Sequence, residues 1–575
     1  MKLDTVLERY VGQFGPYQRY VLLLIFTMSI PAAVHNIGYV FYAATPDHWC
    51  HFTRHYDVIN MTEEQWKRFA IPLKDESKME YEKCSMYSWA TNPNLTGAEI
   101  NATLTALLQG SQLADNQTVS CDSWEYDTWT HVRGSLVTEW NMVCGRAWMK
   151  SNIATAYVIG FMIGAQLGGY LSDRFGRRPL MIGAATMAAG LGLILPFTTN
   201  YIAFLVVRCL LALTWNAHGF AMYTLSLEVV GKKRRSVFTA AYMSMWAVSY
   251  MTVAGVAYGL RTWFIFMLTL AAPTVLFLLV PTCLLPESLQ WLVAKGRQEE
   301  AEAALRKVAK WNKRSLPADL KLTMEQDSIK QRTSILDLVR TPNICRITVI
   351  LCFNWFLNSV VYYNIAWNAD ALHGNLYLNV FFSGLLEIPA YILNVVVLQK
   401  LGRRWGTSLF TLTSGAFFLV SIYVPGIGGT VLILAAKFCI TMTFTMLFLY
   451  TAELYPTVSR GTAMGKVNFV ARLGMILASY IPLMGPLNSA IMCGAICVAG
   501  ATTLLLLPET LNKPLPANVQ EVEQRGRLTI REIFSCVCST RSRRNSSESA
   551  ETKHPQESHP FCQSGSSPKN EYQDC

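Results

Sequence analysis

Charged residues are scarce in this chain. Asp, Glu, Lys and Arg make up 15% of its 575 residues, whereas hydrophobic residues make up 52%. Soluble globular proteins average about 25% charged residues, so this composition argues against the three or four water-soluble domains that the length alone would allow. The sequence therefore favours a protein whose solvent is lipid.

The chain also lacks the motifs of an ATP-driven pump or a metalloenzyme. The string GTAMGKV at 461–467 is one residue short of Gly-x4-Gly-Lys, and it ends in Val where Ser or Thr would bind magnesium. No zinc-spaced Cys/His cluster occurs, and the nine histidines are scattered. We therefore expect no enzyme, with no catalytic residue, metal, cofactor or nucleic-acid partner.

Long apolar runs, by contrast, are abundant. A helix needs roughly 20 mainly apolar residues to cross the hydrocarbon core of a bilayer. Twelve such runs occur, at 20–44, 147–171, 180–198, 201–223, 237–259, 262–285, 345–368, 376–398, 405–425, 430–452, 462–485 and 487–507. The first run has no A-x-A-like exit, so we expect a retained anchor. The pattern predicts an all-α, multi-pass membrane protein with twelve transmembrane helices.

The segment between the first two runs differs from the rest of the chain in charge. Residues 45–146 contain eight Lys and Arg against fourteen Asp and Glu. The short turns RFGRR (174–178), GKKRRS (231–236) and KLGRR (400–404) are basic, and all three lie on one side if the helices alternate. Because basic short loops stay in the cytoplasm, we expect cytoplasmic termini and an extracellular acidic loop.

The same loop carries features of an oxidising compartment. It holds four Asn-x-Ser/Thr sequons, at Asn60, Asn94, Asn101 and Asn116, and four of the 15 cysteines, Cys50, Cys84, Cys121 and Cys144. Glycosylation and two disulfides are expected, with three cysteine pairings open. A sequon is a short match, and Asn545 in the basic tail fits the pattern on the opposite side.

Three motifs recur in the same order. GRR at 176–178 returns at 402–404, Glu228 and Arg235 return as Glu453 and Arg460, and LPES at 285–288 returns as LPET at 507–510. The offsets are 226, 225 and 222 residues. This repeat predicts two related six-helix halves around a central cavity, the plan that resembles the major facilitator superfamily and its alternating access.

The repeat divides the chain into five segments. They are a cytoplasmic N-terminus (1–19), an N-terminal six-helix half (20–285) with the loop 45–146, a cytoplasmic amphipathic insert (286–344), a C-terminal six-helix half (345–507) and a polar, Ser-rich cytoplasmic tail (508–575). The insert is predicted to be amphipathic because four apolar residues recur on one helical face: Ala301, Ala304, Leu305 and Val308.

The stretch GGYLSDRFGRR (168–178) resembles the loop between the second and third helices of that superfamily. The match implies a cytoplasmic gate in which Asp173 and the arginines hold the two halves closed. The gate residues are Asp173, Arg174, Arg177, Arg178, Glu228, Arg235, Glu453 and Arg460. A merely basic turn would explain the arginines but not the Asp and the paired glycines. The second copy has no Asp before its Gly.

Four longer stretches are similar to one family within the superfamily. PESLQWLVAKGRQEEAEAALRKVAKWN (286–312), YLNVFFSGLLEIPAY (377–391), YTAELYPTVSRGTAMG (450–465) and LPETLNKPLP (507–516) resemble the organic cation, anion and zwitterion transporters, solute carrier family 22. The resemblance covers about residues 1–516. This chain departs at Leu289-Gln290, where the family usually has Pro-Arg, and at Gly461, where it has Asn-type residues.

Ionisable residues inside the apolar runs are candidates for the substrate site, because a charge at mid-bilayer is costly without a partner or a cavity. Glu387, Arg472, Arg208 and Lys437 are the four of note. The aromatic residues of these runs include Tyr242, Trp246, Trp355, Tyr362, Tyr363 and Tyr391. An aromatic wall with a carboxylate suits a quaternary ammonium, and a guanidinium suits a carboxylate.

The resemblance places these residues in the central cavity of the family. Five match positions that line it: Glu387, Tyr362, Trp355, Tyr242 and Trp246. Arg472 matches the position that separates the cation branch from the anion and carnitine branches, and Lys437 matches a basic position. A structural ion pair between Glu387 and Arg472 is an equally open interpretation.

Together these features predict a plasma-membrane transporter of small organic ions that works by alternating access. A carnitine-like zwitterion satisfies Glu387 and Arg472 at once and is the first choice, followed by organic anions and then plain organic cations. A non-transporting receptor and a sugar porter are the other classes, and neutral sugars would favour amides and hydroxyls over Glu387. The expected partners are the organic ion, the lipid bilayer and a coupling ion of unassigned identity.

Overall fold

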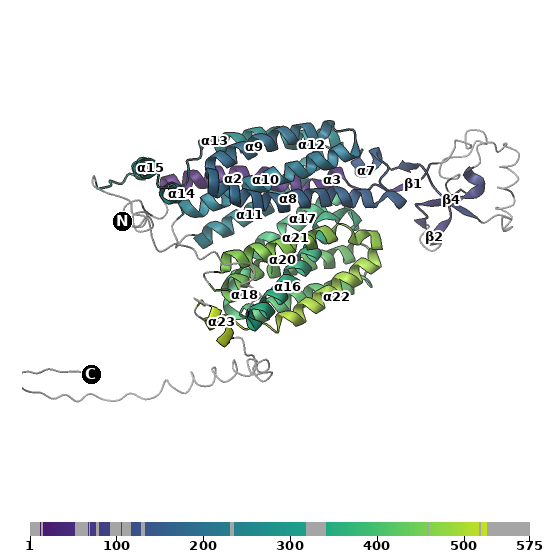
Figure 1. Ribbon diagram of the computed structural model, residues 1–575. Helices are drawn as coiled ribbons and strands as arrows, with labels where there is room; N and C mark the ends of the chain where they lie inside the picture. Colours follow the sequence, from purple (N-terminus) through teal and green to yellow (C-terminus); the bar gives the residue numbers. More distant parts are fainter. Residues whose placement is uncertain are drawn as a thin grey trace, which may run out of the picture. The chain divides into compact units, whose positions relative to one another are not determined.

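The computed structural model describes residues 12, 15–51, 67, 70–75, 80–91, 105, 117–127, 133–230, 235–317, 341–456, 459–513, 515–516 and 519–525. Most of these residues are helical (Figure 1). The contacts reported below lie within the compact unit formed by residues 1–523.

Each predicted apolar run coincides with a helix or a broken helix. The first half contains α2 (Pro16–Ile37) with α3 (Tyr39–Tyr42), α8 (Trp148–Phe175), α9 (Arg177–Ile194), α10 (Tyr201–Val229), α11 (Arg235–Gly259), and α12 (Trp263–Thr274) continued by η6 (Val275–Leu279) and α13 (Val280–Leu284). The second half contains α16 (Pro342–Trp367), α17 (Leu376–Leu385) with α18 (Glu387–Lys400), α19 (Arg403–Ser421), α20 (Ile427–Leu454), α21 (Arg460–Ala478) and α22 (Pro486–Leu504). Two groups of six spans result, as the internal repeat predicts.

Within the part of the chain that the structure describes, nine of these spans are long and apolar enough to cross a membrane. The other three are α11, α19 and α21. Polar residues lower the hydropathy of α19 and α21; α19 buries Thr407, Ser408, Thr411 and Ser414. These helices therefore depend on their neighbours in the bundle to cover their polar faces.

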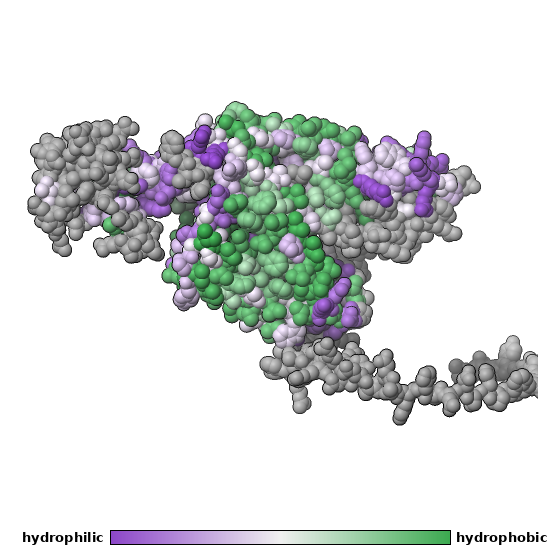
Figure 2. Space-filling view, turned by 180° about the vertical axis from the view of Figure 1, so that it is seen from behind, coloured by the Kyte–Doolittle hydropathy of each residue, from purple (hydrophilic) through white to green (hydrophobic). Residues whose placement is uncertain are grey.

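The side surface of the bundle is apolar (Figure 2). Large hydrophobic side chains are exposed along it, among them Leu23, Ile194, Ile392 and Val431. Hydrophilic residues gather toward its ends. This surface fits a lipid environment, because large contiguous apolar patches are rare on soluble monomeric proteins.

Close approach of helices depends on glycines at four-residue spacing. Gly160, Gly164 and Gly168 on α8 lie against α10, where a Cβ on Gly164 would collide with the carbonyl oxygen of Leu213. In the second half, Gly474 on α21 meets the backbone of Phe356 on α16 in the same way. Small residues at such interfaces are a common device of membrane helices.

We call the end of the bundle next to residues 45–146 the loop end and the opposite end, with Gly176 and Gly402, the basic end. The loop contains β1 (His48–Cys50), β2 (Leu73–Asp75), β3 (Glu80–Tyr81), β4 (Ser85–Tyr87), β5 (Thr118–Ser120) and β6 (Trp124–Tyr126). They form three antiparallel pairs, β1–β6, β2–β3 and β4–β5, with His48 opposite Tyr126 in the first. The described part of the loop also contains the short helices η2 (Ser88–Thr91), α7 (Leu136–Glu139) and η3 (Cys144–Arg146).

Two disulfides cross-link the loop. They join Cys50 to Cys121 and Cys84 to Cys144, which selects one of the three predicted pairings. Asn60, Asn94, Asn101 and Asn116 lie outside the described residues, so their glycosylation stays a prediction.

The insert after α13 forms α14 (Leu289–Ala294) and α15 (Gln298–Trp311). Ala301, Leu305 and Val308 are buried on one face of α15, as its pattern predicts. Trp311 packs against Tyr17 and Tyr20 at the start of α2, with ring centroids 6.1 and 5.0 Å apart. The remaining short helices are η4 (Leu195–Phe197), η8 (Ala369–Ala371), η9 (Ile481–Met484) and α23 (Val519–Arg525).

Candidate functional site

The eighth apolar run is broken in the middle. Residues 376–398 form one apolar run in the sequence, but α17 ends at Leu385 and α18 begins at Glu387. Pro389 explains the break, since proline has no N–H for the carbonyl four residues earlier. The break is local, because Leu386 keeps helical φ and ψ and the N–H of Ala390 still donates to the carbonyl of Leu386, and it places Glu387 in the middle of the span.

Glu387 is enclosed by donors from three helices. Its Oε1 accepts a hydrogen bond from the Tyr362 hydroxyl at 2.6 Å, and its Oε2 accepts one from the Tyr391 hydroxyl at 3.1 Å. Lys437 Nζ lies 3.3 Å from Oε1, and the side chains of Lys437 and Glu387 are 0% and 1% exposed. The predicted Glu387–Arg472 ion pair is therefore wrong for this structure, because the cation beside Glu387 comes from α20.

Lys437 has further contacts that hold it in place. Its Nζ donates to the Ser383 hydroxyl and lies 4.4 Å from the ring centroid of Tyr250 and 5.1 Å from that of Tyr362. Tyr250 belongs to α11, so the charged cluster in the second half touches the first half. A buried charge pair is tolerated only when its remaining polar atoms have partners, and this one has them.

Arg472 occupies a different environment. Its guanidinium lies 4.5 Å from the ring centroid of Phe161 on α8, and its Nη1 contacts Met475 Sδ at 3.7 Å. Among the residues that the structure describes, no carboxylate forms an ion pair with Arg472. The charge of Glu387 is balanced by Lys437, whereas no carboxylate in the described part of the chain balances that of Arg472.

A second guanidinium, that of Arg208, is linked to Arg472 through aromatic rings. Arg208 is 2% exposed and is surrounded by the rings of Tyr39, Tyr42 and Tyr157, with centroids 5.5, 5.2 and 4.9 Å away. Tyr157 stacks on Phe161 at 6.2 Å, so aromatic rings connect Arg208 to Arg472. This row of rings joins cations from the two halves.

The predicted cavity aromatics fall into two groups. Trp355 is 0% exposed, donates from Nε1 to Thr451 Oγ1 at 3.0 Å and packs on Phe448, so in this structure it is a core residue. Tyr242 and Trp246 are half-buried on α11, where Trp246 lies beside Tyr250. Tyr362 contacts Glu387 directly, and the cavity roles of these residues stay predictions.

At the basic end, the predicted gate residues pair within each half. Arg177 Nη2 lies 3.0 Å from Glu228 and 3.2 Å from Asp173, and Arg403 lies 2.9 Å from Glu453. The cation beside Glu453 is thus Arg403, which is not among the predicted gate residues. The side chain of Arg235 lies outside the described residues. Arg174 donates to Tyr170, and Arg178 donates to the carbonyl of Cys283.

Because these contacts do not cross between halves, closure by the Asp173 latch stays a prediction. Asp173 itself is 80% exposed, and exposed ion pairs contribute little stability.

Two residues that fix both gate turns, Glu287 and Glu509, were not predicted from the sequence. Glu287 accepts hydrogen bonds from the backbone N–H of Arg177 and Arg178 at 3.0 and 3.2 Å, and Glu509 does the same for Arg403 and Arg404 at 2.9 and 3.0 Å. Each carboxylate caps the start of a helix, which satisfies N–H groups that no helical carbonyl can reach. The LPES and LPET repeat contained this signal.

The loop end joins the two halves directly. Lys150 Nζ lies 2.6 Å from Asp370 Oδ2, which also accepts from the backbone N–H of Thr45 at 3.2 Å. Nearby, α8 and the end of α21 are linked by Ser151–Ser479 and Asn152–Tyr480 hydrogen bonds, both 2.6 Å long. Inter-half polar contacts thus gather at the loop end, which is closed in this conformation.

Comparison with known proteins agrees with this architecture. The model of the Major Facilitator Superfamily matches residues 147–479. The chain is 32% identical over 531 residues to solute carrier family 22 member 4 of Mus musculus, which covers 90% of this chain and 94% of the relative. It is also 32% identical to the organic cation/carnitine transporter 2 of Homo sapiens (89% and 92% covered) and 31% identical to the organic cation transporter protein of Drosophila melanogaster (92% and 95% covered).

The chain belongs to solute carrier family 22. Among solved structures, this family 22 carrier is similar to the inward-open xylose transporter XylE from E. coli, with a TM-score of 0.53, 20% identity, and 65% of this chain and 89% of that one covered. The likeness confirms the major facilitator fold. The family 22 carrier is accordingly a multi-pass membrane transporter and not an enzyme.

Proposed function

We propose that this family 22 carrier moves small organic ions that bear a carboxylate across the plasma membrane, with a carnitine-like zwitterion as its first substrate class. The observation that carries the proposal is the unequal balance of charge. Glu387 has Lys437 as a partner 3.3 Å away, whereas Arg472 forms no ion pair with a carboxylate of the described residues.

A substrate carboxylate would supply the missing anion. A guanidinium presents a planar fork of donors that matches a carboxylate, and pairing removes the cost of an uncompensated charge away from water. A plain cation would be repelled by Arg472 and would find Glu387 already neutralised. One human relative is named for organic cations and carnitine, and carnitine is the part of that name that agrees with the proposal.

The positive end of a zwitterion needs a different surface. Tyr242 and Trp246 are half-buried on α11, and Tyr362 and Tyr250 lie at the Glu387–Lys437 pair. A quaternary ammonium is attracted to such ring faces without needing a hydrogen bond. Ammonium on the aromatic side and carboxylate on Arg472 is therefore the proposed orientation.

Uptake assays with a variant at Arg472 test the substrate class. Radiolabelled carnitine, a permanent organic cation and an aromatic carboxylate are supplied to cells, each with and without sodium to test for a coupling ion. We expect Arg472→Asp to lower carnitine and carboxylate uptake about tenfold or more while it spares or raises cation uptake. Arg472→Lys is the matched control, because it keeps the charge but loses the fork.

If the unmodified carrier takes up only the permanent cation, and Arg472→Asp behaves identically, then Arg472 does not meet the substrate and the carboxylate assignment fails.

An organic anion without an ammonium is the second candidate. Arg208 favours it, because this buried guanidinium adds a second positive charge to the row of rings next to Arg472. Transport of the aromatic carboxylate in preference to carnitine would select this alternative.

The proposed orientation of the carrier in the plasma membrane places the loop end outside the cell. We expect single Asn→Gln changes at Asn60, Asn94, Asn101 and Asn116 each to increase gel mobility, because each removes one glycan. Asn545→Gln is the control and should leave mobility unchanged. A shift at Asn545 without shifts in the loop would mean that the orientation is reversed.

A further inference from the structure

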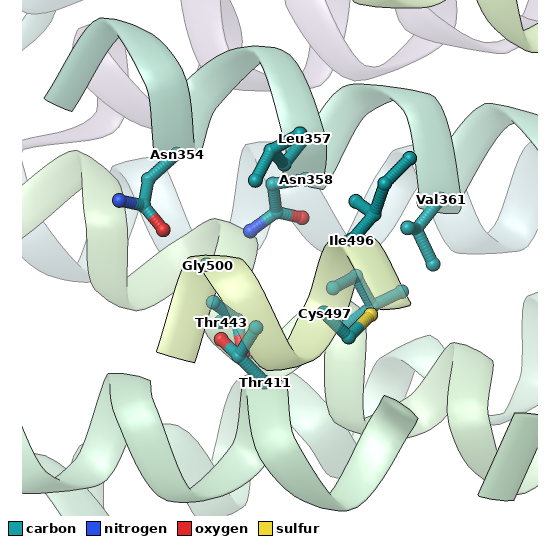
Figure 3. A pocket seen from close by; sticks show the side chains of 10 residues that line it. Asn354, Leu357, Asn358, Val361, Thr411, Thr443, Ile496, Cys497 and Gly500 are labelled. Carbon is teal, nitrogen blue, oxygen red and sulfur yellow. The ribbon is translucent and has the colours of Figure 1, made fainter. Parts of the chain in front are cut away.

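A small cavity with four polar and six apolar or glycine residues in its lining lies inside the second half, apart from the charged site. It has a volume of about 10 Å³ and lies between α16, α19, α20 and α22. Its polar lining consists of Asn354, Asn358, Thr411 and Thr443 (Figure 3). In the same view, the amide of Asn358 points from α16 toward the helix that carries Cys497 and Gly500.

Asn358 is the residue that requires an explanation. It is 4% exposed, and neither its Nδ2 nor its Oδ1 has a protein partner. By contrast, Asn354 Nδ2 donates to Thr503 Oγ1 at 3.0 Å, and Thr411 Oγ1 donates to the carbonyl of Thr407 at 2.7 Å. A buried amide without partners is costly, so a ligand in the cavity would stabilise the fold.

The fold itself does not demand polar residues here. Thr407, Thr411 and Ser414 on α19 correspond, at the repeat offset of 226 residues, to Met181, Ala185 and Ala188 on α9. The three residues of α9 are also buried, so the first half packs apolar side chains at the matching places. Of these three α19 residues Thr411 lines the cavity, and Ala185 shows that helix packing at the matching place does not need its hydroxyl.

The size and chemistry of the cavity select its ligand. The ligand must accept from Asn358 Nδ2 and donate to Oδ1, which a water molecule does and a metal cation cannot. No carboxylate lines the cavity to balance a cation, and the volume is close to that of one water site. Gly500 keeps the space open, because a Cβ there would lie 3.1 Å from Asn354 Oδ1.

We propose that this cavity is a binding site for a single internal water molecule, with Asn358 as its main ligand and Thr411 and Thr443 on its far side. The water links α16 to α19 and α20 within the second half.

Hydroxyl-radical footprinting by brief X-ray radiolysis tests the proposal on the intact carrier. Radicals formed from a bound water oxidise the side chains next to it. Cys497 lines the cavity, whereas Cys493, one turn away on α22, does not, and both are buried. We expect Cys497 to be oxidised several-fold faster than Cys493. Equal, slow oxidation of the two thiols would overturn the proposal without any variant.

Two variants and one ion substitution complete the test. Asn358→Leu should reduce Cys497 oxidation to the rate of Cys493. Asn364→Leu should not change it, because the Asn364 amide already contacts Cys493 Sγ at 3.4 Å and does not line the cavity. The melting temperature is also measured in sodium chloride and in N-methyl-D-glucamine chloride. A higher melting temperature in sodium chloride, seen in the unmodified carrier but not in Asn358→Leu, would assign a sodium ion to the cavity and reject the water.

Discussion

The environment of Glu387 shows how one residue can be found from sequence while its partner cannot. A carboxylate in the middle of an apolar run is conspicuous, because such a charge is costly in lipid. Its partner depends on which helices meet in space, and Lys437 and Arg472 were equally available in the sequence. The structure selects Lys437 at 3.3 Å and adds two tyrosine hydroxyls.

The buried pair leads to a prediction at the scale of single residues. Lys437→Met should destabilise the carrier by about 3–5 kcal/mol, because it leaves the Glu387 charge buried without its cation. Glu387→Gln combined with Lys437→Met should recover most of that loss, since neither charge then remains. Thermal unfolding of the purified carrier measures both effects.

Lys83→Met is the control, because Lys83 pairs with Asp47 on the exposed surface. A double variant that is as unstable as the sum of its single changes would show that the two residues are not coupled.

At the scale of elements, the positions of the helices follow from local sequence. Run length and hydropathy are properties of consecutive residues, so the apolar runs predict where the helices lie, including α11, α19 and α21, which are the less apolar ones in the described part of the chain. The break before Glu387 and the capping of α9 and α19 were not predicted, although Pro389 and the LPES and LPET repeat were visible signals. To predict the break, the effect of a single proline on the helix must be recognised. To predict the caps, one must know that residues more than 100 positions apart in the sequence meet in space.

Gly176 provides the test of the helix caps. Its φ is 108°, a conformation that favours glycine, and a Cβ there would lie 2.5 Å from Glu287 Oε2. We expect Gly176→Ala to cost about 1–3 kcal/mol of stability through strain and displacement of the cap. The melting temperature and the amount of carrier at the cell surface should both fall.

Gly183→Ala on the same helix is the matched control, because a Cβ at Gly183 meets no atom within 4 Å. Equal melting temperatures for the two variants would show that the turn at Gly176 tolerates a side chain and that the Glu287 cap adds nothing.

At the scale of the whole molecule, the two halves are held together at the loop end. Among the described residues, the Lys150–Asp370 pair is a charged contact between the halves there, with side chains 17% and 10% exposed. Charges at helix ends are common, so sequence alone gave no reason to select these two. Their pairing across the halves identifies them as a lock that must open if the loop end is to admit substrate.

A charge exchange tests this lock. Lys150→Asp or Asp370→Lys should each shift the carrier toward opening at the loop end, because like charges then face each other. A cysteine introduced at Ser479 should react faster with a membrane-impermeant thiol reagent in either single variant. The combined exchange should restore slow labelling.

Lys83→Asp reverses a charge in the exposed pair and should not alter labelling. If the combined exchange labels as fast as the single variants, the pair does not control opening.

The disulfide-linked loop has a consequence for work with binding proteins. Cys50 follows α3 by a few residues, and Cys84 is cross-linked to Cys144 just before α8, so both cross-links lie beside helices of the first half. The β1–β6 pair joins the start of the loop to residues 124–126. An antibody fragment that binds this loop would therefore move together with the first half and not with the second. Such a fragment would add mass for electron microscopy without blocking the transport cycle. A fragment that also binds residues 368–376 would hold the carrier in its present conformation.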